Sequence, residues 1–221
     1  MGIEGLGALL KRYAGAKQHI SNIAMMSPGQ TVIGIDMSVP LNAYVSTQRG
    51  AEEYHQQPRH PAHHVAHEAL TFIRKLKRFN ITAIAVFDGH TRHPLKAQHV
   101  GGKRDSGKGG ALQELDQLLK TRWPLTEKEQ SDVIKKIATL RKNSSKVDAS
   151  VQAEVMKVFK ENGIEYIVAP FEADFQLAYM FAMGIIHAIA TTDSDYWAFH
   201  DNPCLLLNLS KGDMKAWICH G

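Results

Sequence analysis

Hydrophobic residues in this sequence form two kinds of pattern, which alternate along the chain. Short continuous runs, several of them rich in Val and Ile, predict strands at 31–36, 81–88, 165–170, 185–191, 204–209 and 214–220. Apolar residues that recur every three or four positions predict helices over 5–15, 63–79, 112–119, 133–140, 151–159 and 171–181. Strands that alternate with helices in this way favour an α/β fold with a central, mostly parallel sheet flanked by helices.

One connection is much longer than an α/β fold requires. More than 70 residues separate Asp88 from the strand near Tyr166, and two of the predicted helices fall between them. Thr126 and Glu129 have the spacing of a capping box for the second of these helices. We therefore expect a helical insertion over the carboxyl edge of the sheet. Its glycine-rich and basic start, HVGGKRDSGKGG, is expected to be mobile without ligand, and the polar stretch 49–61 predicts a loop.

Composition narrows the class of protein. The chain has 221 residues, of which 44% are hydrophobic, enough for one domain with a large insertion. No apolar run approaches the roughly 18 residues of a membrane span, and the first residues lack a secretory pattern. Cys204 and Cys219 are the only cysteines, which favours a reducing intracellular location. A net charge of +4 suits a polyanionic partner, and basic residues cluster at 74–78, 96–108 and 135–146.

Acidic residues follow four of the predicted strands. Single aspartates end the first two, and pairs spaced two residues apart follow the next two, giving Asp36, Asp88, Glu172, Asp174, Asp193 and Asp195. Because parallel strands end at the same edge of a sheet, these acids should converge there, and they would repel one another unless a cation lay between them. Oxygen ligands favour Mg²⁺ or Mn²⁺ over zinc, and two such ions about 4 Å apart promote phosphoryl displacement. The pattern predicts phosphodiester hydrolysis.

Other interpretations of these residues remain open. Either acid pair taken alone could be solvated carboxylates on a loop. The cluster that contains Lys135 and Lys136 could equally be a solvated helix face. His63 and His67 are four residues apart and could share a helix face as metal ligands, although no third ligand is evident nearby.

Five sequence blocks together resemble a known family. They are MGIEGL at the start, GIDMS around Asp36, VFDG around Asp88, VAPFEADFQLAY around Glu172 and Asp174, and TTDSD before Tyr196. In order and spacing they are similar to the flap-endonuclease and xeroderma-pigmentosum-G type of structure-specific 5′-nuclease. FDGHTRHPLK and FEADFQLAY favour its exonuclease 1 branch. The resemblance implies a PIN-like fold in a single nuclease domain, with an N-terminal region at 1–100, a helical arch at 101–147 and an internal region at 148–221.

The resemblance also implies roles for individual residues. The six acids would be catalytic and would bind two Mg²⁺ ions, for which Mn²⁺ may substitute. Lys96 would sit over the scissile phosphate, and Gly2 would lie near the DNA junction. Lys103 and Arg104 would begin the arch helix, with Arg104 also catalytic and Lys108 in contact with DNA. The substrate would be branched, nicked or 5′-flap DNA.

The same resemblance implies a biological setting and one alternative. We expect a monomer that acts in the nucleus, in DNA repair and replication, without a membrane. Any sliding clamp would bind a segment outside this chain, and the family's C-terminal helix-hairpin-helix region is also absent from it.

The chain departs from the family's pattern at two positions. Asn42 stands where relatives have an aromatic ring, which Tyr44 could replace, and His200 stands where a glycine is common. The alternative is a catalytically inactive, RNA-associated binding module on the same fold.

Overall fold

Strands β2 (Thr31–Asp36) and β3 (Ile81–Phe87) pair in parallel within the sheet, and their register covers the whole length of β2. The computed structural model describes residues 17–20, 31–56, 62–89, 101–120, 126–192, 196, 205–207 and 216–219, with backbone alone for 17–20, 101–106, 205–207 and 216–219. Within these ranges the other strands are β1 (Lys17–Ile20), β4 (Tyr166–Val168), β5 (Ala188–Thr191), β6 (Leu205–Leu207) and β7 (Ala216–Cys219). The six predicted strands are thus confirmed.

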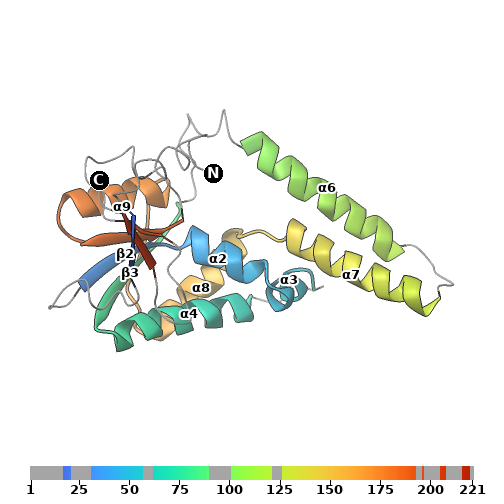
Figure 1. Ribbon diagram of the computed structural model, residues 1–221, viewed down its shortest axis with the longest axis horizontal. Helices are drawn as coiled ribbons and strands as arrows, with labels where there is room; N and C mark the ends of the chain where they lie inside the picture. Colours follow the sequence, from blue (N-terminus) through green and yellow to red (C-terminus); the bar gives the residue numbers. More distant parts are fainter. Residues whose placement is uncertain are drawn as a thin grey trace. The chain divides into compact units, whose positions relative to one another are not determined.

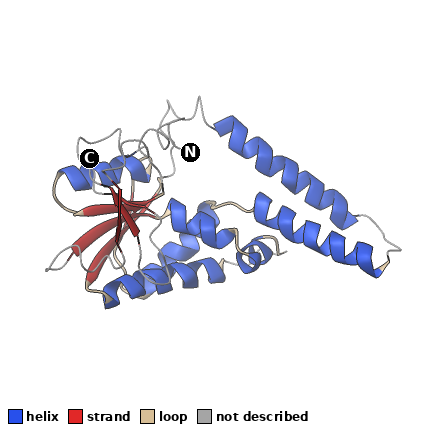
Figure 2. Cartoon of the chain, viewed as in Figure 1, coloured by secondary structure: helices blue, strands red, loops and turns tan. Residues whose placement is uncertain are grey.

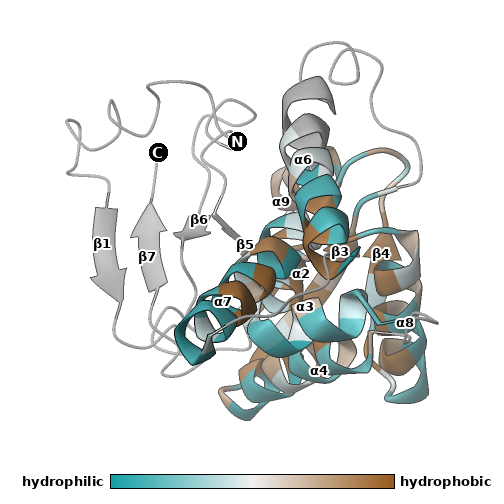
Figure 3. Cartoon of the chain, turned by 90° about the vertical axis from the view of Figure 1, so that its right-hand side faces the viewer, coloured by the Kyte–Doolittle hydropathy of each residue, from teal (hydrophilic) through white to brown (hydrophobic). Residues whose placement is uncertain are grey.

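The strand order is β1-β7-β6-β5-β2-β3-β4. Every pair from β6 to β4 in that order is parallel, whereas β7 is antiparallel to both β1 and β6. Helices flank the strands, and β3 and β4 are hydrophobic along their length (Figures 2 and 3). This arrangement confirms the predicted α/β fold with a mostly parallel sheet.

The helices of the described residues are α2 (Ser38–Val45), α3 (Gln48–Tyr54), α4 (His63–Arg78), α6 (Gly101–Lys120), α7 (Glu127–Ser144), α8 (Ala149–Glu161) and α9 (Ala173–Ala182) (Figure 1). Five of them, α4 and α6 to α9, coincide with predicted helical periods. The helix predicted over 5–15 lies outside the described residues. The capping box at α7 is confirmed, because the side chains and backbones of Thr126 and Glu129 exchange the expected hydrogen bonds.

Four elements differ from the expectation, one of which is α2, a helix that the sequence did not predict. Residues 48–54 form α3 instead of a loop, since the Thr47 side chain accepts a hydrogen bond from Gly50 N–H and caps the helix, while Ala51 and Tyr54 are buried. The helix predicted over 112–119 begins earlier, at Gly101, within the glycine-rich segment, whose expected mobility stays a prediction. Strand β1 was not expected, because it pairs only with β7 at the edge of the sheet and needs no apolar run.

The chain forms two compact units. The sheet unit comprises Met1–Val39, Ala69–Thr91 and Phe159–Gly221, and the helical unit comprises Pro40–Glu68 and Arg92–Val158. In the sheet unit, α9 packs on β2, β3 and β5. A Cβ atom at Gly34 of β2 would overlap the side chains of Leu177 and Ile186, so the absence of a side chain there allows α9 to approach the sheet closely.

In the helical unit, α6 and α7 pack against each other. Lys136 of α7 forms an ion pair with Glu114 of α6 at 2.7 Å. The Lys108 ammonium group donates a hydrogen bond to the Ser145 carbonyl oxygen at the end of α7, at 3.1 Å. The two helices expected in the insertion therefore form a hairpin. None of the described helices is long and apolar enough to cross a membrane.

Candidate metal centre

Asp36 and Asp88 lie at the carboxyl ends of two adjacent parallel strands. Asp36 is the last residue of β2, and its register partner in β3 is Val86, two residues before Asp88. The backbone N–H of Met37 continues the ladder by donating to the Val86 carbonyl oxygen at 3.0 Å. The two carboxylates therefore share one edge of the sheet, as the sequence predicted.

The Asp36 side chain is almost fully buried, at 3% exposure, and its oxygens have neighbours from two other segments. Its Oδ1 atom accepts hydrogen bonds from the Ser38 backbone N–H at 3.0 Å and from Ser38 Oγ at 2.6 Å. Its Oδ2 atom accepts one from Thr191 Oγ1, at the end of β5, at 3.5 Å. These contacts fix the direction of the carboxylate.

Asp88 joins the end of β3 to the start of α9. Its Oδ1 atom accepts a hydrogen bond from the Ala173 backbone N–H at 2.9 Å. The next residue, Gly89, donates its backbone N–H to the Phe171 carbonyl oxygen at 2.6 Å. A Cβ atom at Gly89 would collide with the carbonyl oxygens of residues 169–171, so only glycine fits this exit turn.

Glu172 and Asp174 lie on either side of the start of α9, as expected from their spacing. Glu172 is the N-cap residue in an extended conformation, and its side chain does not cap the helix. Asp174 lies in the first turn, and its Oδ1 atom accepts a hydrogen bond from the hydroxyl group of Tyr196 at 3.1 Å. Tyr196 is 1% exposed, so its ring is fixed by the core.

Electrostatics link three of these acids. Burial raises the pKa of Asp36 to about 7; the Ser38 hydrogen bonds oppose this, and the nearby charges of Asp174 and Asp88 raise it further. Acids from β2, β3 and α9 thus act on one another at one edge of the sheet. A cation would relieve this repulsion, and the all-oxygen donor set fits Mg²⁺.

The described acids do not complete a metal shell by themselves. No three of the described His, Cys, Asp or Glu side chains lie close enough to hold one ion. Two of the six predicted ligands, Asp193 and Asp195, fall outside the described residues, as do Gly2 and Lys96. Lys103 and Arg104 lie in the first turn of α6, and their side chains are likewise not described. Lys108 contacts the end of α7, as given above.

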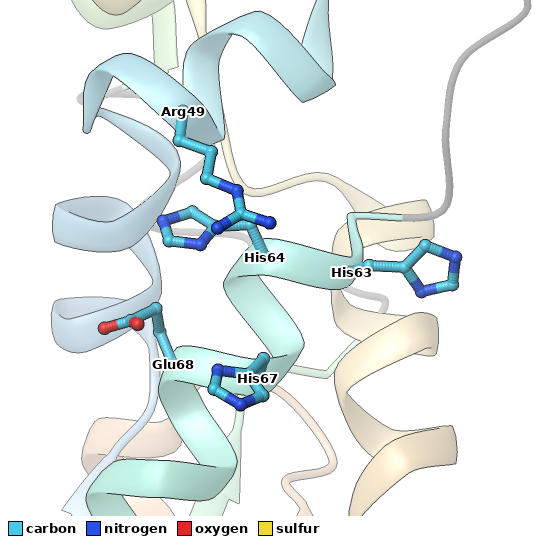
Figure 4. A pocket seen from close by; sticks show the side chains of 5 residues that line it. All are labelled: Arg49, His63, His64, His67 and Glu68. Atoms are coloured by element: carbon cyan, nitrogen blue, oxygen red, sulfur yellow. The ribbon is translucent and has the colours of Figure 1, made fainter.

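The interpretation of His63 and His67 as metal ligands is wrong for the described structure. The two rings point in different directions (Figure 4). His63 Nδ1 lies 3.3 Å from Glu154 Oε1 of α8, and no described group of three metal-ligating side chains includes either histidine. His63 and His67 lie about one turn apart on α4, but their rings do not converge.

Sequence reasoning missed three residues that orient the acids, namely Ser38, Thr191 and Tyr196. Two of them left a signal in the sequence. Ser38 follows Asp36 by two residues, the spacing of a side-chain turn, and Tyr196 directly follows the last acid. Thr191 could be found only once β5 was placed beside β2.

Comparison with known proteins identifies the family. The family model of the XPG N-terminal domain matches residues 1–109, and that of the XPG I-region matches residues 163–217. The chain belongs to the XPG-type family of 5′-nucleases. It is 31% identical over 201 residues to exodeoxyribonuclease 1 of Schizosaccharomyces pombe, covering 90% of this chain and 31% of that protein. It is 28% identical over 223 residues to exonuclease 1 of Danio rerio, covering 100% of this chain and 25% of that protein. This XPG-type chain therefore spans less than a third of these curated relatives.

Solved structures of other proteins show the same fold. The catalytic core of Rad2 in complex with DNA substrate has a TM-score of 0.60 at 18% identity, covering 96% of this chain and 54% of the Rad2 chain. The Holliday junction-resolving enzyme GEN1, in complex with product DNA and a Mg²⁺ ion, has a TM-score of 0.53 at 16% identity, covering 100% of this chain and 40% of that one. At these identities the likeness concerns the fold alone.

Proposed function

We propose that the chain is the catalytic part of a Mg²⁺-dependent, structure-specific 5′-nuclease that hydrolyses phosphodiester bonds in DNA with 5′ ends or flaps. The observation that carries this proposal is the buried Asp36 carboxylate, whose pKa is raised in part by Asp88 and Asp174 at the same edge of the sheet. Membership of the XPG-type family supports the reaction class and the substrate.

The chain's own residues would hold the metal ions and keep their ligands in place. The proposed ligands of two Mg²⁺ ions, which Mn²⁺ could replace, are Asp36, Asp88, Glu172, Asp174, Asp193 and Asp195. When bound, such ions lower the pKa of an attacking water and stabilise the leaving oxygen. Ser38 and Thr191 orient Asp36, the Ala173 N–H orients Asp88, and Tyr196 orients Asp174.

Basic residues would hold the DNA. We propose that Lys96 contacts the scissile phosphate, that Arg104 assists it, and that Gly2, Lys103 and Lys108 contact the DNA. For Lys108 the proposal includes a second role, because its ammonium group already donates a hydrogen bond to the Ser145 carbonyl oxygen.

The decisive experiment uses a 5′-labelled flap and a nicked duplex, incubated with the chain in Mg²⁺, in Mn²⁺ or in chelator. We expect product with either ion, none in chelator, and none with Asp88→Ala or Asp193→Ala. Glu161→Ala is the matched control, because Glu161 is an exposed acid at the end of α8. An unchanged cleavage rate in both aspartate variants would contradict the proposal. A gel shift without Mg²⁺-dependent product would assign the chain to the inactive binding class instead.

A further inference from the structure

The end of helix α7 is held by side chains from outside that helix. Atom Nε2 of His55, the residue directly after α3, lies 3.0 Å from Ser144 Oγ and 3.2 Å from the Arg141 carbonyl oxygen. Lys108 of α6 donates to the Ser145 carbonyl oxygen. The last carbonyl groups of a helix have no partners within the helix, and here residues distant in the sequence contact two of them. Ser144 and Ser145 are both buried.

The neighbours of the His55 ring assign its role as a hydrogen-bond donor. Ser144 Oγ lies 2.7 Å from the Leu140 carbonyl oxygen, to which it donates its single proton. A carbonyl oxygen only accepts, so His55 Nε2 carries the proton that points toward Ser144 Oγ and the Arg141 carbonyl oxygen. The ring therefore donates to the last turn of α7.

The residue before His55 contacts the start of the next helix. The hydroxyl group of Tyr54, a residue that is 7% exposed, donates to Asp148 Oδ2 at 3.3 Å. Asp148 Oδ1 in turn accepts from the backbone N–H groups of Ser150 and Val151 in the first turn of α8. Figure 1 shows α3 beside the end of α7, against which it packs. The end of α3 thus contacts both sides of the connection from α7 to α8.

These contacts connect α3 with the start of α6. Helix α6 packs on α7, and Lys108 is bonded to Ser145 at the end of α7. Lys103, Arg104 and Lys108, the residues of α6 that are proposed to act on DNA, all lie near its start. Their distance from α3 therefore depends on where the end of α7 lies, and His55 contacts that end.

We propose that His55 is a positioning residue of the nuclease, whose ring holds the hairpin of α6 and α7 in place relative to α3. This inference rests on the proposed function, because the hairpin carries proposed DNA-binding residues. A lysine side chain is flexible enough to reach a phosphate from a slightly displaced helix, so DNA affinity should depend little on His55. The rate should depend on it more, since a displacement of about 1 Å can slow a reaction by about 100-fold.

The first test asks whether His55 holds the end of α7. It compares His55→Ala with His55→Gln, because the glutamine amide group can donate a hydrogen bond and alanine cannot. Backbone hydrogen exchange of peptides that cover 141–148 is followed by mass spectrometry in chelator. We expect faster exchange in His55→Ala and wild-type exchange in His55→Gln. Peptides from β2 and β3 should exchange as in the wild type, which shows that the variants are folded.

Gln56→Ala is the matched control for this test, because it removes the exposed side chain of the next residue. Its exchange over 141–148 should equal that of the wild type. Unchanged exchange in His55→Ala would overturn the proposal, because the end of α7 would then be held without the ring.

The second test uses cleavage of a 5′-labelled flap to distinguish positioning from simple capping of α7. In His55→Ala we expect kcat to fall about 10-fold while the Kd for the flap, measured in chelator, changes by less than about 2-fold. His55→Gln should restore kcat. A wild-type kcat in His55→Ala despite faster exchange would overturn the positioning role, as would a low kcat that glutamine does not restore. If the wild type gives no Mg²⁺-dependent product, the nuclease proposal and the positioning role fail together, whereas exchange alone decides whether His55 holds α7.

Discussion

The Asp88 carboxylate accepts a hydrogen bond from the backbone N–H of Ala173 at 2.9 Å, which ties the end of β3 to the start of α9. One side chain thus contributes to the stability of a helix start and to the candidate metal centre. A carboxylate is stabilised at a helix N-terminus both as an acceptor for an unpaired N–H and by the helix dipole. The two contributions can be separated, because accepting the Ala173 N–H requires only an oxygen atom, whereas the candidate metal centre requires the negative charge.

Substituting Asp88 should separate these contributions. Asp88→Asn keeps an oxygen that can accept from Ala173, whereas Asp88→Ala does not. Both variants should lose Mg²⁺-dependent cleavage by more than about 100-fold, because each removes a proposed metal ligand. Measured by thermal unfolding in chelator, the Asn variant should be about 1 kcal/mol more stable than the Ala variant. Equal stabilities of the two variants would contradict a capping role for Asp88.

Gly89 should tolerate no side chain. A Cβ atom there would collide with the backbone carbonyl oxygens of 169–171, and backbone cannot move aside as a flexible side chain can. Gly89→Ala should therefore cost about 1–3 kcal/mol, the usual scale of overpacking, and should move Asp88 away from α9. Thermal unfolding should show a fall of about 2–4 °C per kcal/mol, accompanied by reduced cleavage. The control is Gly109→Ala in α6, where a Cβ atom would meet nothing within 4 Å. This variant should not lose stability, and it should gain about 0.5–1 kcal/mol because alanine favours a helix interior over glycine.

The acids of the candidate centre could be predicted because each ends an apolar run, and the position of a parallel strand fixes the edge at which its last residue lies. Asp36 and Asp88 are the examples that the structure confirms. Residues that depend on which strands become neighbours could not be predicted. Thr191 contacts Asp36 only because β5 pairs with β2. That pairing depends on packing between two segments whose residues are 155 positions apart in the sequence. Helix α3 was not predicted for a different reason. Its few buried residues lie among polar ones, so the sequence shows no clear hydrophobic period there.

Asp36→Asn should inactivate the protein and yet stabilise it when metal is removed. At about pH 8, above the pKa of about 7, Asp36 is a buried anion close to Asp88 and Asp174. An asparagine can still accept from Ser38 and donate to Thr191, and it removes the buried charge. In chelator we expect a gain of about 1–3 kcal/mol, measured by thermal unfolding. Asp132→Asn, on the exposed face of α7, should change stability little. A loss of stability in Asp36→Asn would show that the carboxylates do not repel one another.

The first turn of α7 should become less stable as the pH falls. Hydrogen bonds from the side chain and backbone of Thr126 lower the pKa of Glu129 below its ordinary value of 4.5. Because the folded-state pKa is lowered, the stabilisation is present above the unfolded value and is lost as pH falls through the folded one. Thr126→Ala removes the hydroxyl partner, so the Glu129 pKa should rise toward 4.5 in an NMR titration. Thr139→Ala, on the same helix, should leave the titration of Glu129 unchanged.

Tyr196→Phe should change the affinity for metal more than it changes the fold. The ring of Tyr196 is buried in the core with Val86 and Leu177, and phenylalanine keeps that packing. Only the hydroxyl group that donates to Asp174 at 3.1 Å is lost, at a cost of about 1 kcal/mol in stability. Groups that orient metal ligands typically contribute about 10- to 100-fold to metal affinity. The Mg²⁺ concentration for half-maximal cleavage should therefore rise by at least about 10-fold.

The same variant distinguishes orientation of a ligand from direct participation in the reaction. If Tyr196 acts only by orienting Asp174, the cleavage rate should return to that of the wild type once Mg²⁺ is saturating. Tyr179→Phe is the control, because Tyr179 lies on the same unit, is 58% exposed and does not belong to the core around α9. A rate that stays low at saturating Mg²⁺ would place the Tyr196 hydroxyl group in contact with the reacting atoms. An unchanged Mg²⁺ requirement would mean that Asp174 needs no such support, and that its position is set by the first turn of α9 alone.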